Sequence, residues 1–228
     1  MSIFSFMATQ AIENYLKALF TLSENSEAIN VSDLAKRMEV SLPTVNSMVK
    51  KLASLGLVNY ERYKPVELTG SGRREAALII RKHRLTEMFL VEKMGIGWDE
   101  VHEIAEHIEH LKSPLFFDRL DEILGFPAHD PHGSPIPDKK GNIQNRELKK
   151  LTEFQTGEKV VLKALANTED QFLRYLDQNG LALESAITIV NVEEFDGSMT
   201  LSYPGHLKRV FSEKVCRMLL AVSLQGEG

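Results

Sequence analysis

Residues 31–58, VSDLAKRMEVSLPTVNSMVKKLASLGLV, decide how the first part of the chain folds. The first nine residues have the spacing of a short helix, with Ser32 as the predicted N-cap. A second helix is predicted to start at Ser41, with Pro43 in its first turn and Gly56 at its end. Two short helices joined by a tight turn are typical of a helix-turn-helix, whose second helix enters the major groove of DNA.

The flanking segments extend this pattern to a winged helix-turn-helix. Residues 8–24 carry one apolar stripe at helical spacing, and residues 57–69 form two β-like runs around a turn at Lys64-Pro65. Residues 36–84 hold 11 Lys and Arg against 4 Glu, a net charge of +7 that favours phosphate binding. A small helical bundle with a hairpin is the alternative interpretation of the same pattern.

The bulk composition narrows the class of protein. The chain has 228 residues, 43% of them hydrophobic, and a net charge of −5. Cys216 is the single cysteine, so no intramolecular disulfide can form, and we expect a reducing compartment, the cytoplasm. The first residues, MSIFSFMATQ, lack the features of a signal peptide, and no apolar run is long enough to span a membrane. We therefore expect no membrane association.

An acidic block follows the basic one and contains most of the histidines. Residues 85–130 hold 11 Asp and Glu against 3 Lys and Arg, a net charge of −8. Within it, residues 102–110, HEIAEHIEH, place side chains at i, i+4, i+7 and i+8 on one helix face. Upstream, His83 and Glu87 are also four residues apart, so two helices can surround a divalent cation. The stripe consists of His102, Glu106, Glu109 and His110, and the apolar face predicted to bury consists of Ile104, Ala105, Ile108 and Leu111.

Three interpretations of this stripe compete. A solvated helix face would need no partner, and Glu103 and His107 fit that description. The second interpretation is a zinc hydrolase. The run HEIAE resembles the H-E-x-x-H motif of such enzymes but has Glu106 where the motif has its second histidine. No nucleophile signature accompanies it, so we predict that the chain is not an enzyme. The third interpretation is a regulatory metal site, and a winged-helix regulator that senses a small organic ligand is the alternative function.

The chain changes character after a loop at residues 126–149 that is rich in proline and glycine. The runs KVVLKAL, SAITIVNV and SMTLSY are β-type, with a helical piece at residues 169–180. We expect a small β-barrel of about 75 residues there. The fold class is therefore a mostly α N-terminal part, with a winged helix-turn-helix and a helical dimerisation domain, followed by a small SH3-like β-barrel. The predicted domains are 1–74 for DNA binding, 75–140 for metal binding and dimerisation, and 150–228 for the third domain.

Together these runs resemble the diphtheria-toxin-repressor and manganese-transport-regulator family of metal-activated bacterial repressors. The resemblance covers about residues 10–138, and the tail resembles the family's SH3-like (FeoA-type) third domain, most clearly at EEFDGSMTL. It implies a homodimer that binds double-stranded operator DNA when metal is bound and controls manganese or iron uptake genes. No small organic substrate is expected. The matching runs are ENYLKALFTLSE, VSDLAKRMEVSLPTVNSMVKKLASLGLV, RKHRLTEMFL, VHEIAEHIEHLKS and PHGSPIPD.

The resemblance implies a primary metal site and names its ligands. Glu106 stands where iron-sensing relatives often have Cys, which indicates the manganese-type branch, with Mn²⁺ as the metal and Fe²⁺ as the alternative. Two positions depart from that branch, because Asn14 replaces an Asp and Lys17 replaces the additional Glu that a two-metal arrangement needs. The implied primary ligands are Asn14, His83, Glu106, Glu109 and His110.

Long members of the family have an ancillary metal site, which the resemblance places at Glu87, His102 and His132. Asp130 lies where one relative has Cys. The positions of third-domain ligands fall on residues that cannot bind metal, Lys163 and Ala166, with Glu169 or Asp170 as possible substitutes.

The predicted DNA contacts lie on the second helix of the helix-turn-helix and on the wing. Thr44 and Ser47 would face base edges, and Ser41 and Pro43 would lie beside the backbone or thymine methyl groups. The predicted phosphate contacts are Lys50, Lys51 and Arg62.

Overall fold

The computed structural model describes residues 3–25, 28–144 and 146–224, and the chain divides into two compact units. The first unit comprises Met1–Thr86, Ala105–Ala128 and Ile136–Gln144. The second comprises Glu87–Ile104, His129–Pro135 and Asn145–Gly228. Two helices, α4 (Gly70–Met94) and α5 (Val101–Ile108), contribute residues to both units.

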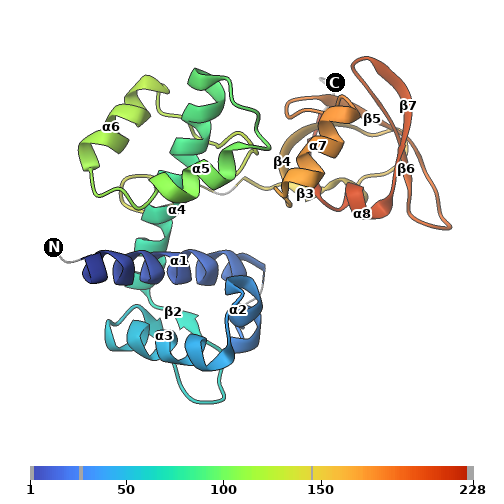
Figure 1. Cartoon of the computed structure of the whole chain (residues 1–228). Helices are drawn as coiled ribbons and strands as arrows, with labels where there is room; N and C mark the ends of the chain where they lie inside the picture. Colours follow the sequence, from blue (N-terminus) through green and yellow to red (C-terminus); the bar gives the residue numbers. More distant parts are fainter. Residues whose placement is uncertain (1–2, 26–27, 145, 225–228) are drawn as a thin grey trace. The chain divides into compact units, whose positions relative to one another are not determined.

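The first unit begins with the predicted winged helix-turn-helix, in the blue-to-cyan part of Figure 1. Its elements are α1 (Ile3–Asn25), α2 (Val31–Met38), α3 (Leu42–Ser54) and a hairpin of β1 (Val58–Asn59) with β2 (Glu67–Leu68). Apolar side chains from α1, α2, α3, the hairpin and the first turns of α4 share one core. Its largest fully buried members are Leu19, Leu34 and Leu52.

The structure confirms most of the predicted start and end residues of these helices. The Ser41 hydroxyl accepts a hydrogen bond from the Thr44 N–H at 3.4 Å, and Pro43 lies in the first turn of α3. Gly56 follows the helix with a φ of 71°. The prediction for Ser32 is wrong, because the N-cap of α2 is Asn30. The Ile29 carbonyl accepts a 2.8 Å bond from the Val66 N–H, so the chain stays extended up to Asn30.

The first unit also contains α6 (Pro114–Ile123), which starts at a Ser113 cap. The buried Asp121 of α6 forms an ion pair with Arg81 of α4, which also donates to the Pro137 carbonyl at 2.7 Å. A single charged group therefore joins α4, α6 and the loop that follows. The predicted burial of the apolar face of α5 is only partly right. Ala105 is buried, whereas Ile104 and Leu111 are exposed together with Leu115, Ile123 and Phe126.

The second unit contains a six-stranded antiparallel sheet in the order β3-β8-β4-β5-β6-β7. Buried residues of the strands and of α7 form its core, including Leu162, Ile189 and Leu176. The strands are β3 (Lys149–Lys150), β4 (Lys159–Leu165), β5 (Ala186–Val192), β6 (Met199–Tyr203), β7 (His206–Phe211) and β8 (Leu219–Ser223). The helices are η1 (Leu151–Glu153), α7 (Asp170–Gln178) and α8 (Glu213–Cys216).

The predicted barrel is confirmed only as an antiparallel sheet domain. Among the described residues, β3 and β7 are the two edges of the sheet and do not pair, so the sheet is open. Strand β7 was missed because HLKRVF has four consecutive exposed residues, which gives no alternation of apolar and polar side chains. In the described part of the chain, no helix combines the length and apolar character needed to cross a membrane.

Candidate metal centres and DNA interface

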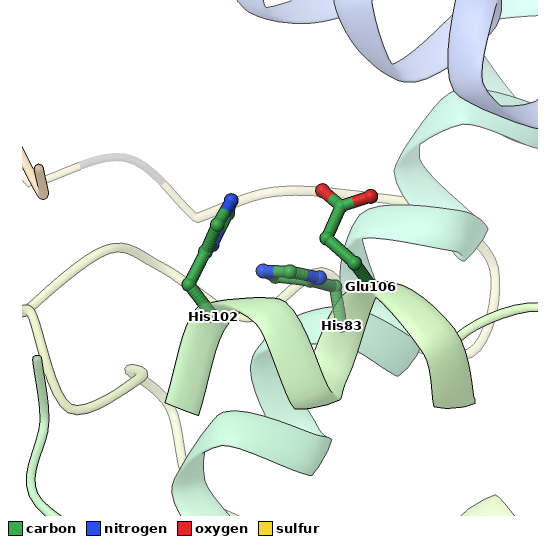
Figure 2. Close-up of side chains that lie close together, drawn as sticks. All are labelled: His83, His102 and Glu106. Carbon is green, nitrogen blue, oxygen red and sulfur yellow. The ribbon is translucent and has the colours of Figure 1, made fainter. Parts of the chain in front are cut away.

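The primary cluster lies within the first unit, where α4 and the end of α5 meet. His83 of α4 has its Nδ1 2.5 Å from Oε2 of Glu109, and both residues are buried. Glu106 lies one turn earlier on α5 and is partly exposed. Figure 2 shows the side chains of His83 and Glu106 close together, with His102 one helical turn before Glu106. The predicted primary residues His83, Glu106 and Glu109 are thus brought to one place.

Lys17 of α1 enters the same cluster. Its Nζ lies 2.5 Å from Oε1 of Glu106, 2.8 Å from Oε2 of Glu109 and 3.2 Å from Nδ1 of His83. The ammonium group therefore contacts three of the predicted metal ligands at once. The sequence showed that this position departs from the family pattern, but it did not show that the lysine reaches the ligands.

His110 joins the cluster through a residue that sequence reasoning missed. Its Nδ1 lies 2.6 Å from Oε2 of Glu13, and its Nε2 lies 3.8 Å from Oε1 of Glu109. A histidine that donates its Nδ1–H to a carboxylate keeps the Nε2 lone pair free for a metal. The sequence offered one signal that could have identified Glu13. It lies one helical turn before Lys17 and next to Asn14, so it shares their part of the first helix.

One buried oxygen of this cluster, Oε1 of Glu109, lacks a hydrogen-bond donor among the described residues. The buried Oδ1 of Asn14, the neighbour of Glu13 in α1, also lacks one among them. A buried acceptor without a partner is costly, and a cation is one partner that satisfies it. The carboxylates of Glu13, Glu106 and Glu109 and the imidazoles of His83 and His110 suit a hard divalent ion such as Mn²⁺. The residues present therefore fit a metal.

A second cluster lies within the second unit. Glu87, Asp130 and His132 are all buried, and one ligand atom from each lies within 4.8 Å of the others. His102 is exposed, but its Nδ1 lies 3.2 Å from Oε1 of Glu87. The predicted ancillary residues Glu87, His102 and His132 are thus near one another, and Asp130 joins them.

The backbone sets the orientation of His132. Its Nε2 donates to the Trp98 carbonyl at 2.9 Å, so in the neutral ring Nδ1 carries the lone pair, and Nδ1 lies 3.9 Å from Oε2 of Glu87. The Trp98 ring stacks on the imidazole at 5.9 Å. Asp130 uses Oδ1 to accept from the backbone N–H groups of His132 and Ser134, which holds the loop in place. This cluster also fits a cation.

Lys163 and Ala166, the third-domain positions where relatives have metal ligands, belong to neither metal cluster. Lys163 pairs with Glu184 at 2.5 Å, and Ala166 is exposed. The substitutes Glu169 and Asp170 are exposed at the start of α7 and belong to neither cluster. On α5, Glu103 and His107 are exposed.

The predicted DNA-contacting residues are exposed at the start of α3, along α3 and in the wing. On α3, Val45, Val49 and Leu52 face the core, so the opposite side of the helix is turned outward. The Ser41 and Thr44 hydroxyls lie 2.8 Å apart, which ties the start of the helix together. All seven predicted contacts are exposed: Ser41, Pro43, Thr44, Ser47, Lys50, Lys51 and Arg62.

The wing is attached to this surface. The Tyr60 hydroxyl donates to Oδ1 of Asn46 at 3.1 Å, which joins the hairpin to α3. The Arg62 guanidinium stacks over the ring of Tyr63, which is 88% exposed. Leu42 and Lys50 help to line a groove between α3 and the wing. Asn46 and Tyr63 were missed by sequence reasoning because a neutral amide and one aromatic in a loop carry no charge signal.

Three family models match the chain. Residues 7–66 match the iron dependent repressor N-terminal DNA binding domain, and residues 69–138 match the iron dependent repressor metal binding and dimerisation domain. Residues 149–215 match the FeoA domain. The two repressor models together cover more than half of the chain. The chain belongs to the diphtheria-toxin-repressor and manganese-transport-regulator family.

Two curated relatives match most of its length. The iron-dependent repressor IdeR of Mycobacterium leprae is 31% identical over 85% of this chain and 89% of its own. The diphtheria toxin repressor of Corynebacterium diphtheriae is 30% identical over 85% of this chain and 88% of its own. These family members are transcriptional repressors, which confirms the prediction that the chain is not an enzyme.

Solved structures extend the comparison to manganese. A manganese-dependent transcriptional repressor in complex with manganese is 34% identical, with a TM-score of 0.85, over 93% of this chain and 100% of its own. The manganese regulator SloR is 31% identical, with a TM-score of 0.75, over 93% of this chain and 98% of its own. The relatives thus include both iron-dependent and manganese-dependent repressors.

Proposed function

We propose that this family member is a metal-activated transcriptional repressor. Bound Mn²⁺, or Fe²⁺ as the alternative, orders a homodimer for binding to double-stranded operator DNA of metal-uptake genes in the cytoplasm. The observation that carries the proposal is the convergence of His83, Glu106, Glu109 and His110 with Glu13 of α1. Helix α1 also packs on the DNA-reading part of the same unit.

This arrangement gives the metal a mechanical role. The apolar side of α1 lies in the core with α2 and α3, and its polar side carries Glu13 and Lys17 into the primary cluster. His83, Glu106, Glu109 and His110 would hold a divalent ion, which would supply the positive charge that the two carboxylates need. Because Glu13 of α1 orients His110 and α1 supports α3, metal bound here would be coupled to the DNA-reading helix, and metal and DNA would raise each other's affinity reciprocally.

The ligand chemistry favours the manganese-type branch. The primary cluster contains carboxylates and imidazoles, and the single cysteine, Cys216, is buried in the core of the second unit. Hard oxygen ligands suit Mn²⁺, whereas thiolates suit softer metals. We assign Glu87, His102 and His132 to an ancillary site, with Asp130 as a further ligand.

An exposed apolar surface supports the homodimer. Leu111, Leu115, Phe116, Ile123 and Phe126 are exposed at the end of α5 and on α6 and its following turn. Contiguous exposed apolar side chains mark interaction sites. These residues fall within the segment that matches the metal binding and dimerisation domain, so a second copy of the chain is the proposed partner.

We further propose three functional domains with the predicted boundaries. Residues 1–74 bind DNA, residues 75–140 bind metal and dimerise, and residues 150–228 form the FeoA-type, SH3-like domain built on the antiparallel sheet. The three matched segments, 7–66, 69–138 and 149–215, support this division.

Fluorescence anisotropy of labelled operator-length DNA at one fixed salt concentration tests the function, because salt changes every such affinity. We expect tight binding only when Mn²⁺ or Fe²⁺ is present. A Glu106→Ala/His110→Ala variant should lose the metal response, whereas the control Glu103→Ala/His107→Ala, on the exposed face of α5, should keep it. Equal affinity of the unmodified chain with and without metal would contradict the proposal.

A further inference from the structure

The amine of Lys17 occupies the centre of the primary cluster. It contacts Glu106 at 2.5 Å, Glu109 at 2.8 Å and His83 at 3.2 Å. Glu106, Glu109 and His83 are residues that the proposed function assigns to a divalent ion, and Lys17 contacts Oε2 of Glu109, next to the Oε1 that lacks a donor. An ammonium group in contact with both carboxylates occupies the space between them and repels a divalent ion there, so the amine and the metal compete for one place.

Charge explains why a lysine is stable there. Glu109 is completely buried, and a buried carboxylate without a positive partner is strongly unfavourable. Lys17 supplies that partner and also links α1 to α4 and α5. The cluster therefore contains a cation that is part of its own chain.

We propose that Lys17 is a built-in competitor of the metal, and that a divalent ion binds by displacing its amine from Glu106 and Glu109. The inference rests on the proposed function and deepens it, because Lys17 then sets the metal concentration at which the repressor responds. A positive charge kept beside the metal would repel it at close range. The lysine has a flexible stem, and its side chain is already 17% exposed, so it has a route to solvent.

Calorimetric titration of the full chain with Mn²⁺ tests this directly. In this titration the reference chain and the Lys17→Met chain both carry Glu87→Gln and His132→Ala, which remove two ligands of the ancillary cluster. Only the primary cluster then binds Mn²⁺, and in this comparison the unmodified chain means the reference chain. We expect Lys17→Met to bind Mn²⁺ roughly tenfold or more tightly, because no ammonium has to leave. Lys208→Met, which removes an exposed charge of β7, should match the unmodified chain. Equal affinity in the Lys17→Met and unmodified chains, or no binding to either, overturns the inference.

Two further measurements remain decisive if Lys17→Met folds poorly. Lys17→Arg keeps the positive charge and should bind Mn²⁺ no more tightly than the unmodified chain; tighter binding would contradict competition. In the unmodified chain, mass spectrometry after brief acetylation should show low labelling of Lys17 without metal and several-fold more labelling at saturating Mn²⁺. Unchanged labelling at saturation means that the amine is not displaced.

The same proteins separate this inference from the proposed function. If Mn²⁺ binds and exposes Lys17 but DNA affinity does not respond, the repressor mechanism is wrong and the competition is right. If DNA affinity responds to Mn²⁺ while Lys17→Met leaves Mn²⁺ affinity unchanged, the repressor mechanism stands and the competition is wrong.

Discussion

Oε2 of Glu13 lies 2.6 Å from Nδ1 of His110, although 97 positions separate the two residues in the chain. The carboxylate orients the imidazole so that Nε2 faces Glu109. We predict that Glu13→Ala lowers the Mn²⁺ affinity of the primary cluster by roughly 10- to 100-fold, the usual effect of losing such a partner. Isothermal titration measures it. Glu13→Asp should recover part of the affinity, and full affinity in Glu13→Ala would show that His110 needs no orientation.

The ancillary cluster should report its own occupancy through fluorescence. Trp98 is the single tryptophan, its ring stacks on His132, and its carbonyl accepts from that imidazole. We expect Mn²⁺ to quench Trp98 emission and His132→Ala to abolish the quenching. The control is His129→Ala, in the same loop, in which Mn²⁺ should still quench the Trp98 emission. Quenching that survives His132→Ala would place the ion elsewhere.

Lys50 should contribute to DNA binding through phosphate alone. It is exposed on α3 beside the groove to the wing. We predict that Lys50→Ala weakens binding to all DNA sequences alike and lowers the salt slope of log K by about 1, the effect of one lost phosphate contact. Binding titrations at several salt concentrations measure the slope. Lys208→Ala, on the exposed side of β7, should leave it unchanged. A loss confined to one DNA sequence would instead make Lys50 a base contact.

The apolar surface of α6 should control self-association. Leu115 is 67% exposed, which is unfavourable for a free leucine in water. If a second copy covers it, Leu115→Ala should weaken the dimer by about 2 kcal/mol, the value of burying one such side chain. Sedimentation at a series of concentrations detects the change. Leu207→Ala, at a site 85% exposed on β7, should have no effect. An unchanged dimer in Leu115→Ala would move the interface to another surface.

Cys216 should be unreactive in the folded protein. Burial raises the pKa of its thiol from the ordinary value of 9.0 to about 12. Iodoacetamide at pH 8 should therefore alkylate the native chain slowly and the urea-unfolded chain quickly, since the thiolate is the nucleophile. The folded pKa is the higher one, so the stabilisation is complete below pH 9 and is lost as the pH rises towards 12. Equal alkylation rates in the two states would contradict this burial.

Local sequence patterns determined the elements of the DNA-binding part. The apolar spacing of residues 8–24, the caps at Ser41 and Gly56, and the basic charge of residues 36–84 each depend on neighbours within a few positions. The stripe on α5 has the same local origin, because helical periodicity alone aligns Glu106 with Glu109 and His110. The family resemblance then linked these segments to metal and DNA.

Only the tertiary structure decided what surrounds that stripe. The contacts of Glu13 with His110 and of Lys17 with Glu106 join positions far apart in the chain, and no period in the sequence encodes them. The same holds for Leu111, which has the pattern of a core residue but lies exposed. Periodicity shows which side chains share a face, whereas packing between distant segments decides what that face contacts.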